Sequence, residues 1–286
     1  MTKLNVGILH PGEMGISIAA SIQNTGHTVY WVSEGRSQKT CARAAKFGLV
    51  DAGTLDQLCE TCSVIASVCP PHAAEDVANQ VSSRSFKGLY LDANAISPQR
   101  VVRIGQTMTR TGASFVDGGI IGGPAWRPGS TWLYLSGEDA QAVVPFFSAG
   151  PLGTCVIGEA IGKASALKMC FAAYTKGTSA LLCAILATAE TLGVREELQH
   201  QWSRNGSDFA EQASQRVRRV TAKAWRFAGE MDEIASTFKE AGMPGEFHAA
   251  AADIYRRITH FKDAPTTPSL EDVLAALTQG QTESDI

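Results

Sequence analysis

The order of elements near the amino terminus is the feature that most constrains the fold. An apolar stretch at 4–10 has the composition of a buried strand and runs straight into Pro11-Gly-Glu-Met-Gly15 and an apolar helix expected over 14–24. In such a turn Gly12 lets the backbone approach a pyrophosphate, and Gly15 lets the helix pack closely on the strand. The unpaired amides and positive dipole end of the helix favour an anion there. This order predicts the opening of a dinucleotide-binding βαβ unit.

The turn departs from the usual Gly-x-Gly-x-x-Gly pattern at its first position. His10 stands where the first glycine is expected, which leaves only Gly-x-x-Gly. That shorter pattern also occurs in ordinary strand-turn-helix packing sites. A packing turn without a ligand is therefore the alternative that the motif alone leaves open.

The end of the second expected strand, 28–32, indicates which nicotinamide cofactor is preferred. An NAD site usually has an acidic residue at this strand end to hold the ribose 2′-hydroxyl, whereas an Arg accommodates a 2′-phosphate. Ser33, Arg36 and Ser37, with Lys39 close behind, favour NADP. Glu34 can also serve an adenosine ribose, so NAD remains the alternative.

The first half of the chain alternates strand-like and helix-like segments at short spacing. Further strands are expected at 62–69, 88–92, 113–117 and 131–136. Such alternation predicts a mostly parallel sheet covered by helices. Ligands of open α/β sheets bind outside the carboxyl ends of the strands, so the residues at those ends are the candidates for function.

Strand signals end near Gly162, and Ala, Leu, Glu and Arg dominate the rest of the chain. We expect helices at 163–192, 196–204, 208–219, 222–241, 245–261 and 270–278, followed by a frayed end at 282–286. The first of these helices is apolar almost all round, which favours burial between domains or subunits. The predicted fold class is an α/β Rossmann domain with a doubly wound sheet over 1–160, followed by an all-α domain over 161–286.

Charge and composition exclude several classes of function. A net charge of −3 over 286 residues gives no reason to expect binding to nucleic acid or to an anionic membrane. The longest uncharged apolar stretch, 177–189, is too short to span a bilayer, and no signal-peptide pattern precedes the first strand. The seven cysteines stand in apolar contexts typical of reduced core residues, and no metal site is predicted. We therefore expect a soluble cytoplasmic protein.

Several short blocks follow one another in a characteristic order and spacing. They are Val6–Gly15, Val68–Pro71, Asp92–Pro98, Asp117–Gly123 and Gly162–Lys168. Together they resemble the β-hydroxyacid dehydrogenase and 6-phosphogluconate dehydrogenase superfamily over most of the chain. In that family the blocks are the cofactor turn, a loop beside the nicotinamide ribose, two substrate loops and the segment that ends in the catalytic lysine.

The resemblance implies a set of site residues. Those expected to bind the cofactor, at the turn and at the following strand ends, are His10, Pro11, Gly12, Glu13, Met14, Ser33, Arg36, Ser37, Cys69, Pro70, Pro71 and Asn94. Those expected beside the substrate are Asn94, Ile121, Gly122, Gly123, Ala172 and Thr175. The strand-end residues Ser33, Arg36 and Ser37 make NADP the expected cofactor, and the resemblance implies a small-molecule substrate.

Lys168 is the residue that the resemblance assigns to proton transfer. A lysine in a desolvated cleft has a lowered pKa and can exchange a proton with a substrate oxygen while hydride moves to or from the nicotinamide. The alternative is a lysine whose stem lies along the helix and whose head reaches solvent.

The chain also departs from the family at the positions that hold the substrate. Ala172 stands where the family carries Asn, Ile121 replaces a Ser that helps to hold a carboxylate, and Asn94-Ala95 replaces a Ser-Thr pair. Thr175 or Lys176 can take the place of the missing Asn, although either can equally be a packing or surface residue. These losses resemble a divergent branch related to imine reductases.

In that branch, three residues of the helical half are candidates to face the cleft from the same chain or from a partner subunit. They are Glu230, Asp232 and His248. Surface positions on periodic helices are the simpler expectation for all three.

Three classes of function follow from these observations. The first is an NADP-dependent oxidoreductase that interconverts an alcohol and a carbonyl, with Lys168 as general acid and base. The second is a reductase of cyclic imines or iminium ions, which the apolar Ile121 favours and Lys168 disfavours. The third is a non-catalytic NADP-binding protein. The apolar circumference of the first long helix predicts a homodimer.

Overall fold

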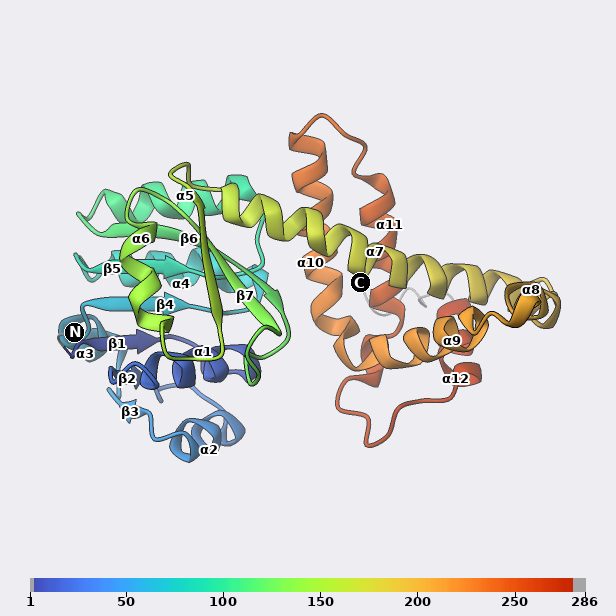
Figure 1. Cartoon of the computed structure of the whole chain (residues 1–286), viewed down its shortest axis with the longest axis horizontal. Helices are drawn as coiled ribbons and strands as arrows, with labels where there is room; N and C mark the ends of the chain where they lie inside the picture. The colour runs from blue at the N-terminus through green and yellow to red at the C-terminus, as the bar shows by residue number, and fades with distance from the viewer. Residues whose placement is uncertain (1–2, 280–286) are drawn as a thin grey trace. The chain divides into compact units, whose positions relative to one another are not determined.

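The computed structural model describes residues 3–279 and divides into two compact units, Met1–Met169 and Cys170–Ile286 (Figure 1). The first unit carries the sheet and the second is helical. The frayed end expected at 282–286 lies outside the described residues.

An eight-stranded sheet forms the centre of the first unit, in the order β3-β2-β1-β4-β5-β6-β7-β8. The strands are β1 Asn5–Ile8, β2 Thr28–Trp31, β3 Val50–Asp51, β4 Val64–Ser67, β5 Leu89–Asp92, β6 Ser114–Gly122, β7 Thr131–Ser136 and β8 Gly153–Gly158. β7 runs antiparallel to β6, and every other neighbouring pair is parallel. The predicted fold, a mostly parallel Rossmann sheet followed by helices, is confirmed.

Helices cover both faces of the sheet. They are α1 Glu13–Gln23, α2 Gln38–Lys46, α3 Leu55–Thr61, α4 Ala74–Ser82, α5 Pro98–Thr109 and α6 Ala140–Val143, with 3-10 turns at Pro71–Ala73 and Val144–Phe147. Successive strand side chains point to opposite faces. Ala66 of β4 therefore packs with α1 and α6, whereas its neighbour Ile65 packs with α3, α4 and α5. The two faces give two separate apolar cores.

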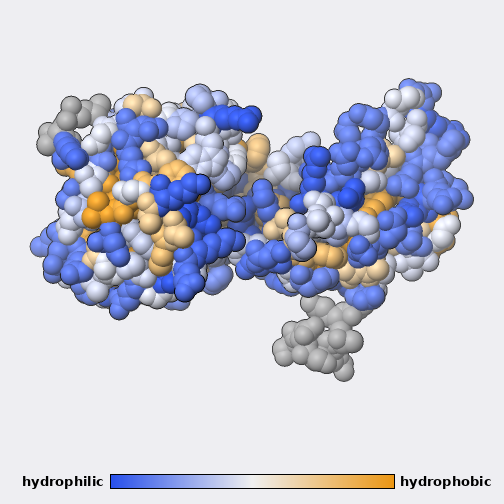
Figure 2. All heavy atoms as spheres, turned by 90° about the horizontal axis from the view of Figure 1, so that it is seen from below, coloured by the Kyte–Doolittle hydropathy of each residue, from blue (hydrophilic) through white to orange (hydrophobic). Residues whose placement is uncertain are grey.

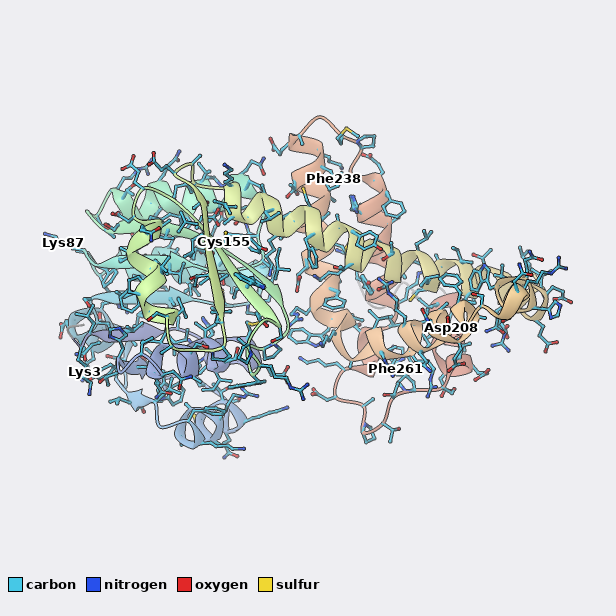
Figure 3. The ribbon with its side chains drawn as sticks, in the orientation of Figure 1. Lys3, Lys87, Cys155, Asp208, Phe238 and Phe261 are labelled. Atoms are coloured by element: carbon cyan, nitrogen blue, oxygen red, sulfur yellow. The ribbon has the colours of Figure 1, made fainter. Side chains whose placement is uncertain are left out.

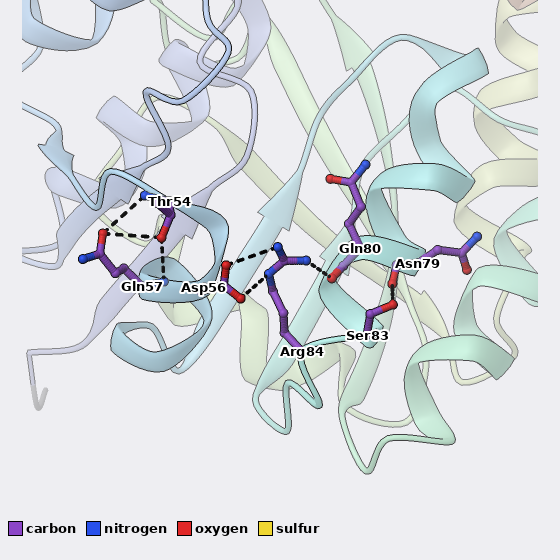
Figure 4. A network of polar contacts seen from close by, with 7 residues as sticks. All are labelled: Thr54, Asp56, Gln57, Asn79, Gln80, Ser83 and Arg84. Carbon is purple, nitrogen blue, oxygen red and sulfur yellow. Dashed lines mark hydrogen bonds and ion pairs between the residues drawn. The ribbon is translucent and has the colours of Figure 1, made fainter.

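A polar network ties α3 to the carboxyl end of α4 on one face of the sheet (Figure 4). Thr54 caps α3 by accepting a hydrogen bond from the Gln57 amide at 3.3 Å. The Arg84 guanidinium lies 2.9 Å from Asp56 of α3 and donates to the Gln80 carbonyl of α4 at 2.8 Å. The Thr54 end of this network lies next to the carboxyl end of β2, because the Glu34 amide donates to the Gly53 carbonyl at 3.2 Å.

The second unit consists of helices and follows the predicted boundaries closely. Its elements are the long helix α7 Lys163–Thr191, which begins in the first unit, α8 Arg195–Trp202, α9 Phe209–Val220, α10 Ala224–Glu240, α11 Glu246–Arg257 and α12 Leu270–Thr278, with 3-10 turns at Arg204–Gly206, Thr221–Lys223 and Thr259–Phe261. The hydropathy surface shows exposed apolar patches on each unit among mostly hydrophilic atoms (Figure 2).

The helix α7 is longer than the other described helices. Among residues 3–279 it alone is long and apolar enough, by length and composition, to cross a membrane. Half of its most apolar window is buried within the protein, and a buried core helix passes the same test. The apolar stretch 177–189 is thus only the middle of a helix that also carries Lys168 and Lys176.

Candidate functional site

Of the two glycines in the β1–α1 turn, Gly15 allows close packing and Gly12 leaves open space. A Cβ on Gly15 would lie 2.0 Å from the His10 carbonyl oxygen, so only glycine allows α1 to approach the turn this closely. A Cβ on Gly12 would meet nothing within 4 Å. Gly12 begins α1 with no side-chain cap on the helix amides within the described chain. The open space at Gly12 and the uncapped amides are what a bound pyrophosphate requires.

Two arginines are anchored to the same turn. Arg36 donates from Nη2 to the Leu9 carbonyl at 3.3 Å, and Arg43 of α2 donates from Nη1 to the Pro11 carbonyl at 3.2 Å. Burial, together with the charge of Arg36, lowers the pKa of His10 to about 4. The His10 imidazole is therefore neutral near pH 7. Arg43 could not be predicted from the sequence, because its contact with Pro11 joins residues that are 32 positions apart.

The segment after β2 has the features of an anion site. Ser37 begins α2 and its side chain accepts from the Thr40 amide at 3.3 Å. Gly35 has a φ of +70°, which turns the chain between Ser33 and Arg36. Glu34 and Lys39 are exposed. Cationic groups and a helix start therefore lie together at this strand end.

Asn94, at the end of β5, is buried and fully engaged with its neighbours. Its Oδ1 accepts from the Cys69 amide at 2.6 Å, and its Nδ2 donates to Ser67 at 3.1 Å and to Asp92 at 3.0 Å. Both amide hydrogens are thus used within the protein. Asn94 holds the start of the Cys69-Pro70-Pro71 segment at the end of β4, and in this geometry its amide hydrogens point at protein acceptors.

Asp92 is buried beneath Asn94. Burial raises the pKa of Asp92 to about 7, against the hydrogen bonds that Asn94 donates to it. Its two oxygens accept from the backbone and side-chain nitrogens of Asn94, each at 3.0 Å. Ser67, Asp92 and Asn94 form a buried polar cluster that fixes the ends of two adjacent parallel strands.

Asp117 of β6 ties the sheet to the start of α7. Its Oδ2 accepts from the amides of Gly162 at 3.0 Å and Ser165 at 3.1 Å, and its Oδ1 accepts from the Ser165 hydroxyl at 2.6 Å. Ser136 of β7 donates to the same carboxylate at 2.9 Å and accepts from the Ala164 amide at 3.0 Å. A buried carboxylate and a hydroxyl thus cap the amino-terminal end of the helix.

The segment 117–123 was expected to form a loop, and this is wrong for most of it, because β6 continues to Gly122. The expected place of Ile121, Gly122 and Gly123 beside the substrate stays a prediction. Its glycines permit close packing instead of a turn. A Cβ on Gly118 would lie 3.0 Å from the Asp92 carbonyl oxygen, and one on Gly119 would lie 2.5 Å from the Ala164 carbonyl oxygen. Ile121 pairs with Trp132 of β7, and the exposed Gly122 and Gly123 end the strand.

Lys168 lies one turn beyond the anchored start of α7. Its Nζ donates to the Ile120 carbonyl at 2.7 Å, and its Cβ is the neighbour that a Cβ on Gly119 would meet at 3.3 Å. The side chain is half-buried. The head of Lys168 is thus held against the end of β6 instead of extending along the helix surface.

The strand order brings these groups to one edge of the sheet. β2, β1, β4, β5 and β6 are successive neighbours, so their carboxyl ends follow one another along that edge. Strand order reverses between β1 and β4, which is where open α/β sheets bind ligands. The predicted residues of the first unit therefore form a row that starts at Arg36, passes the glycine turn and the end of β4, and ends at Lys168.

The predicted residues in the helical unit have other partners. The Thr175 hydroxyl donates to the Phe171 carbonyl of its own helix at 3.2 Å. Lys176 forms an ion pair with Glu230 at 2.9 Å. Ala172 is buried. These contacts lie within the helical unit, and the expected place of Ala172 and Thr175 beside the substrate stays a prediction.

The expectation of surface positions is wrong for Glu230 and His248. Glu230 is 5% exposed between Lys176 and Arg226, and His248 is 6% exposed between the rings of Phe238 and Phe247. Phe238 lies near the carboxyl end of α10 (Figure 3). The partly exposed Lys176 and Arg226 neutralise the buried Glu230, and His248 packs among aromatic rings. Asp232 is exposed and pairs with Arg256 at 2.6 Å.

The cysteines and acidic residues form no metal centre in the described part of the chain. No group of three or more His, Cys, Asp or Glu side chains is placed to hold an ion. All seven cysteines are free thiols, and burial raises the pKa of Cys62 to about 12. Cys155 lies on the edge strand β8 (Figure 3).

Comparisons with known proteins agree with this geometry. Residues 5–151 match the NAD binding domain of 6-phosphogluconate dehydrogenase, and residues 189–258 match a domain of unknown function, DUF1932. The first match covers just over half of the chain, so the protein belongs to the 6-phosphogluconate dehydrogenase-like family. It is an NAD(P)-dependent dehydrogenase or reductase.

Individual relatives extend the likeness over the whole chain. An uncharacterized 28.5 kDa protein of Methanothermus fervidus is 29% identical over 196 residues, 68% of this chain and 74% of that protein. A conserved protein whose structure is described as similar to 3-hydroxyacid dehydrogenases is 28% identical, with a TM-score of 0.68. The match covers 96% of this chain and 100% of that protein.

Two further structures share the fold at lower identity. The 3-hydroxyisobutyrate dehydrogenase of Mycobacterium tuberculosis is 15% identical, with a TM-score of 0.70 and coverage of 97% and 100%. An imine reductase variant of Myxococcus stipitatus is 18% identical, with a TM-score of 0.55 and coverage of 97% and 100%.

Proposed function

We propose that this protein is an NADP-dependent oxidoreductase that interconverts an alcohol and a carbonyl in a small-molecule substrate. The observation that carries the proposal is the position of Lys168. Its Nζ is held 2.7 Å from the Ile120 carbonyl oxygen, on a helix whose start is fixed by Asp117. An oriented ammonium at the carboxyl edge of a Rossmann sheet has the geometry of a general acid.

Lys168 moves the proton in this mechanism. A bound nicotinamide supplies the hydride in reduction and accepts it in oxidation. As the substrate carbonyl is reduced, Lys168 Nζ donates a proton to its oxygen, and in oxidation the neutral amine takes that proton back. The Ile120 carbonyl holds one N–H of Lys168 and so restricts where the remaining hydrogens can point.

The other proposed site residues divide into cofactor and substrate groups. Residues 10–14 hold the pyrophosphate, with Gly12 giving the backbone its close approach, and the Cys69-Pro70-Pro71 segment lies beside the nicotinamide ribose. Asn94 acts through this segment, because its amide holds the Cys69 backbone. Ile121, Gly122, Gly123, Ala172 and Thr175 are the proposed substrate group. We assign cofactor binding to 1–160, and substrate binding and dimerisation to 161–286.

NADP is the proposed cofactor because Arg36 and Ser37 follow β2. Replacing Arg36 with Gln is expected to raise the KM for NADPH about tenfold or more, since a charge-assisted hydrogen bond to the 2′-phosphate is lost. The KM for NADH serves as the internal control, because NADH lacks that phosphate. Equal weakening of both cofactors would mean that Arg36 only anchors the turn through the Leu9 carbonyl.

Reduction of a cyclic imine or iminium ion is the second candidate. Ile121 favours it, because an apolar side chain cannot hold the carboxylate that the Ser of hydroxyacid enzymes holds. Turnover of NADPH with a panel of 3-oxo acids and a panel of cyclic imines separates the two. We expect turnover with the oxo acids or related carbonyls; turnover confined to the imines would reverse the assignment.

A cytoplasmic homodimer is the proposed assembly. Phe171, Tyr174 and Leu181 of α7 are 47%, 71% and 44% exposed. Their spacing of three and seven residues places them along one seam of the helix. Such a seam supports pairing with a second copy of the chain.

Replacing both Tyr174 and Leu181 with Glu is expected to give monomers. Light scattering that finds a monomer for the parent protein at micromolar concentration would contradict the assembly.

A further inference from the structure

A cavity of about 410 Å³ opens among the helices of the second unit. Its walls come from α7, α9, the turn Thr221–Lys223 and α10, and the only charged residues among those that line it are Arg216, Arg219 and Lys223. No carboxylate of the described chain lines it. The size lies within the range of small-molecule sites, about 300–1,000 Å³.

Arg216 is oriented by uncharged groups. Its Nε donates to the Ser179 hydroxyl at 2.7 Å, and its Nη2 donates to the Thr175 carbonyl at 2.7 Å and the Thr178 hydroxyl at 2.6 Å. Three of its five N–H donors are thereby used on α7, and within residues 3–279 the two on Nη1 have no acceptor. This holds the guanidinium fork rigid without neutralising its charge.

Two carboxylates lie beside the cavity wall, and each is hydrogen-bonded by the side-chain amide of a glutamine that lines the cavity. Asp208, at the start of α9 (Figure 3), accepts from the Gln212 amide, and Glu211 accepts from the Gln215 amide. In the described chain, neither Arg219 nor Lys223 has a carboxylate within 4.0 Å, whereas Arg195, Arg226 and Arg256 of the same unit all form ion pairs. Within residues 3–279 the three cations of the cavity therefore have no direct ion pair, and the two nearby carboxylates are reached only through Gln212 and Gln215.

The uncharged residues of the wall are of two kinds: Ser179, Gln212 and Gln215 are polar, and Phe227 and Val220 are apolar. Phe227 of α10 and Val220 of α9 line the cavity, and Val220 is 7% exposed. An apolar wall beside an arginine fork suits an organic molecule with one anionic group.

We propose that this cavity binds a small organic anion, whose carboxylate or phosphate is held by Arg216, Arg219 and Lys223. Both groups present the paired oxygens that the fork of Arg219 recognises, because Arg219 makes no hydrogen bond within residues 3–279. Arg216 adds the two hydrogens of its Nη1. The site lies within the helical unit and goes beyond the proposed nicotinamide chemistry.

Isothermal titration calorimetry on the full-length protein tests the proposal at fixed ionic strength and without NADPH. The probes are inorganic phosphate and malonate. We expect at least one of them to bind with a Kd of about 1 mM or below. A phosphate preference or a malonate preference identifies the anionic group, and absence of binding by both would overturn the proposal.

A double variant, Arg219→Gln with Lys223→Gln, locates the binding. Within residues 3–279 neither side chain makes a hydrogen bond that supports the fold, so we expect the variant to remain folded. Its Kd for the probe should be about tenfold higher or more. Arg204→Gln removes one exposed charge outside the cavity and is the control. A double variant that binds like the parent, or a control that loses as much affinity, would refute the site. Because no cofactor is present, this result is independent of the hydride-transfer proposal.

Discussion

Replacing Lys168 with methionine is expected to lower kcat by about 10²–10⁴-fold and to leave the Kd for NADPH within about twofold. Methionine keeps most of the side chain's length and apolar packing but removes Nζ, which carries the proposed proton and the hydrogen bond to the Ile120 carbonyl. Steady-state turnover together with a fluorescence titration of NADPH measures both quantities.

A matched lysine controls for loss of charge on the same helix. Lys163 lies in the first turn of α7 and is exposed, so Lys163→Met is expected to turn over like the parent. The pH profile adds a second readout, because removing a general acid also removes its ionisation from the kcat curve. Undiminished turnover in Lys168→Met would remove this residue from the mechanism.

Replacing Gly15 with alanine is expected to damage both the fold and the cofactor site. The new Cβ would lie 2.0 Å from the His10 carbonyl oxygen, a backbone atom that cannot move without displacing the turn. We expect the free energy of unfolding to fall by about 1–3 kcal/mol, as in other overpacked sites. Chemical denaturation measures the loss, and NADPH binding should weaken at least tenfold (about 1.4 kcal/mol) because the turn moves.

Gly12→Ala is the matched control for this prediction. Its Cβ would meet nothing within 4 Å, and the φ of −68° suits any residue. The free energy of unfolding should therefore stay within about 1 kcal/mol of the parent. NADPH affinity should nevertheless fall at least tenfold, because the methyl group occupies the space proposed for the pyrophosphate. NADPH binding at parental affinity would show that the cofactor does not lie against Gly12.

The helical half could be predicted from local pattern, whereas two strands could not. The helix expected at 163–192 is observed at Lys163–Thr191, because its composition and length are decided within the segment. β3 has two residues, Val50–Asp51, too few for any periodicity. β8, at Gly153–Gly158, is an edge strand whose pairing with β7 is set by its neighbour.

The glycines of β6 explain the error at 117–123. Consecutive glycines usually indicate a loop, yet Gly118 and Gly119 are required because a neighbouring strand and α7 approach the backbone. In the sequence, Asp117 stands out only as the first residue of the 117–123 block, although it makes the hydrogen bonds that fix the start of α7. Contacts over more than forty residues have no local signal, so neither role could be predicted from the sequence.

Asp117 holds the start of α7 by hydrogen bonds within the first unit. The proposed acid–base residue, Lys168, precedes the boundary between the units at Met169, and its hydrogen bond to the Ile120 carbonyl lies within the first unit. The helical half can then be replaced or can drift in sequence without displacing the proton donor. Exchange of the helical half would change the range of substrates while the proton-transfer step stays the same. A chimaera joined after Met169 would test this exchange.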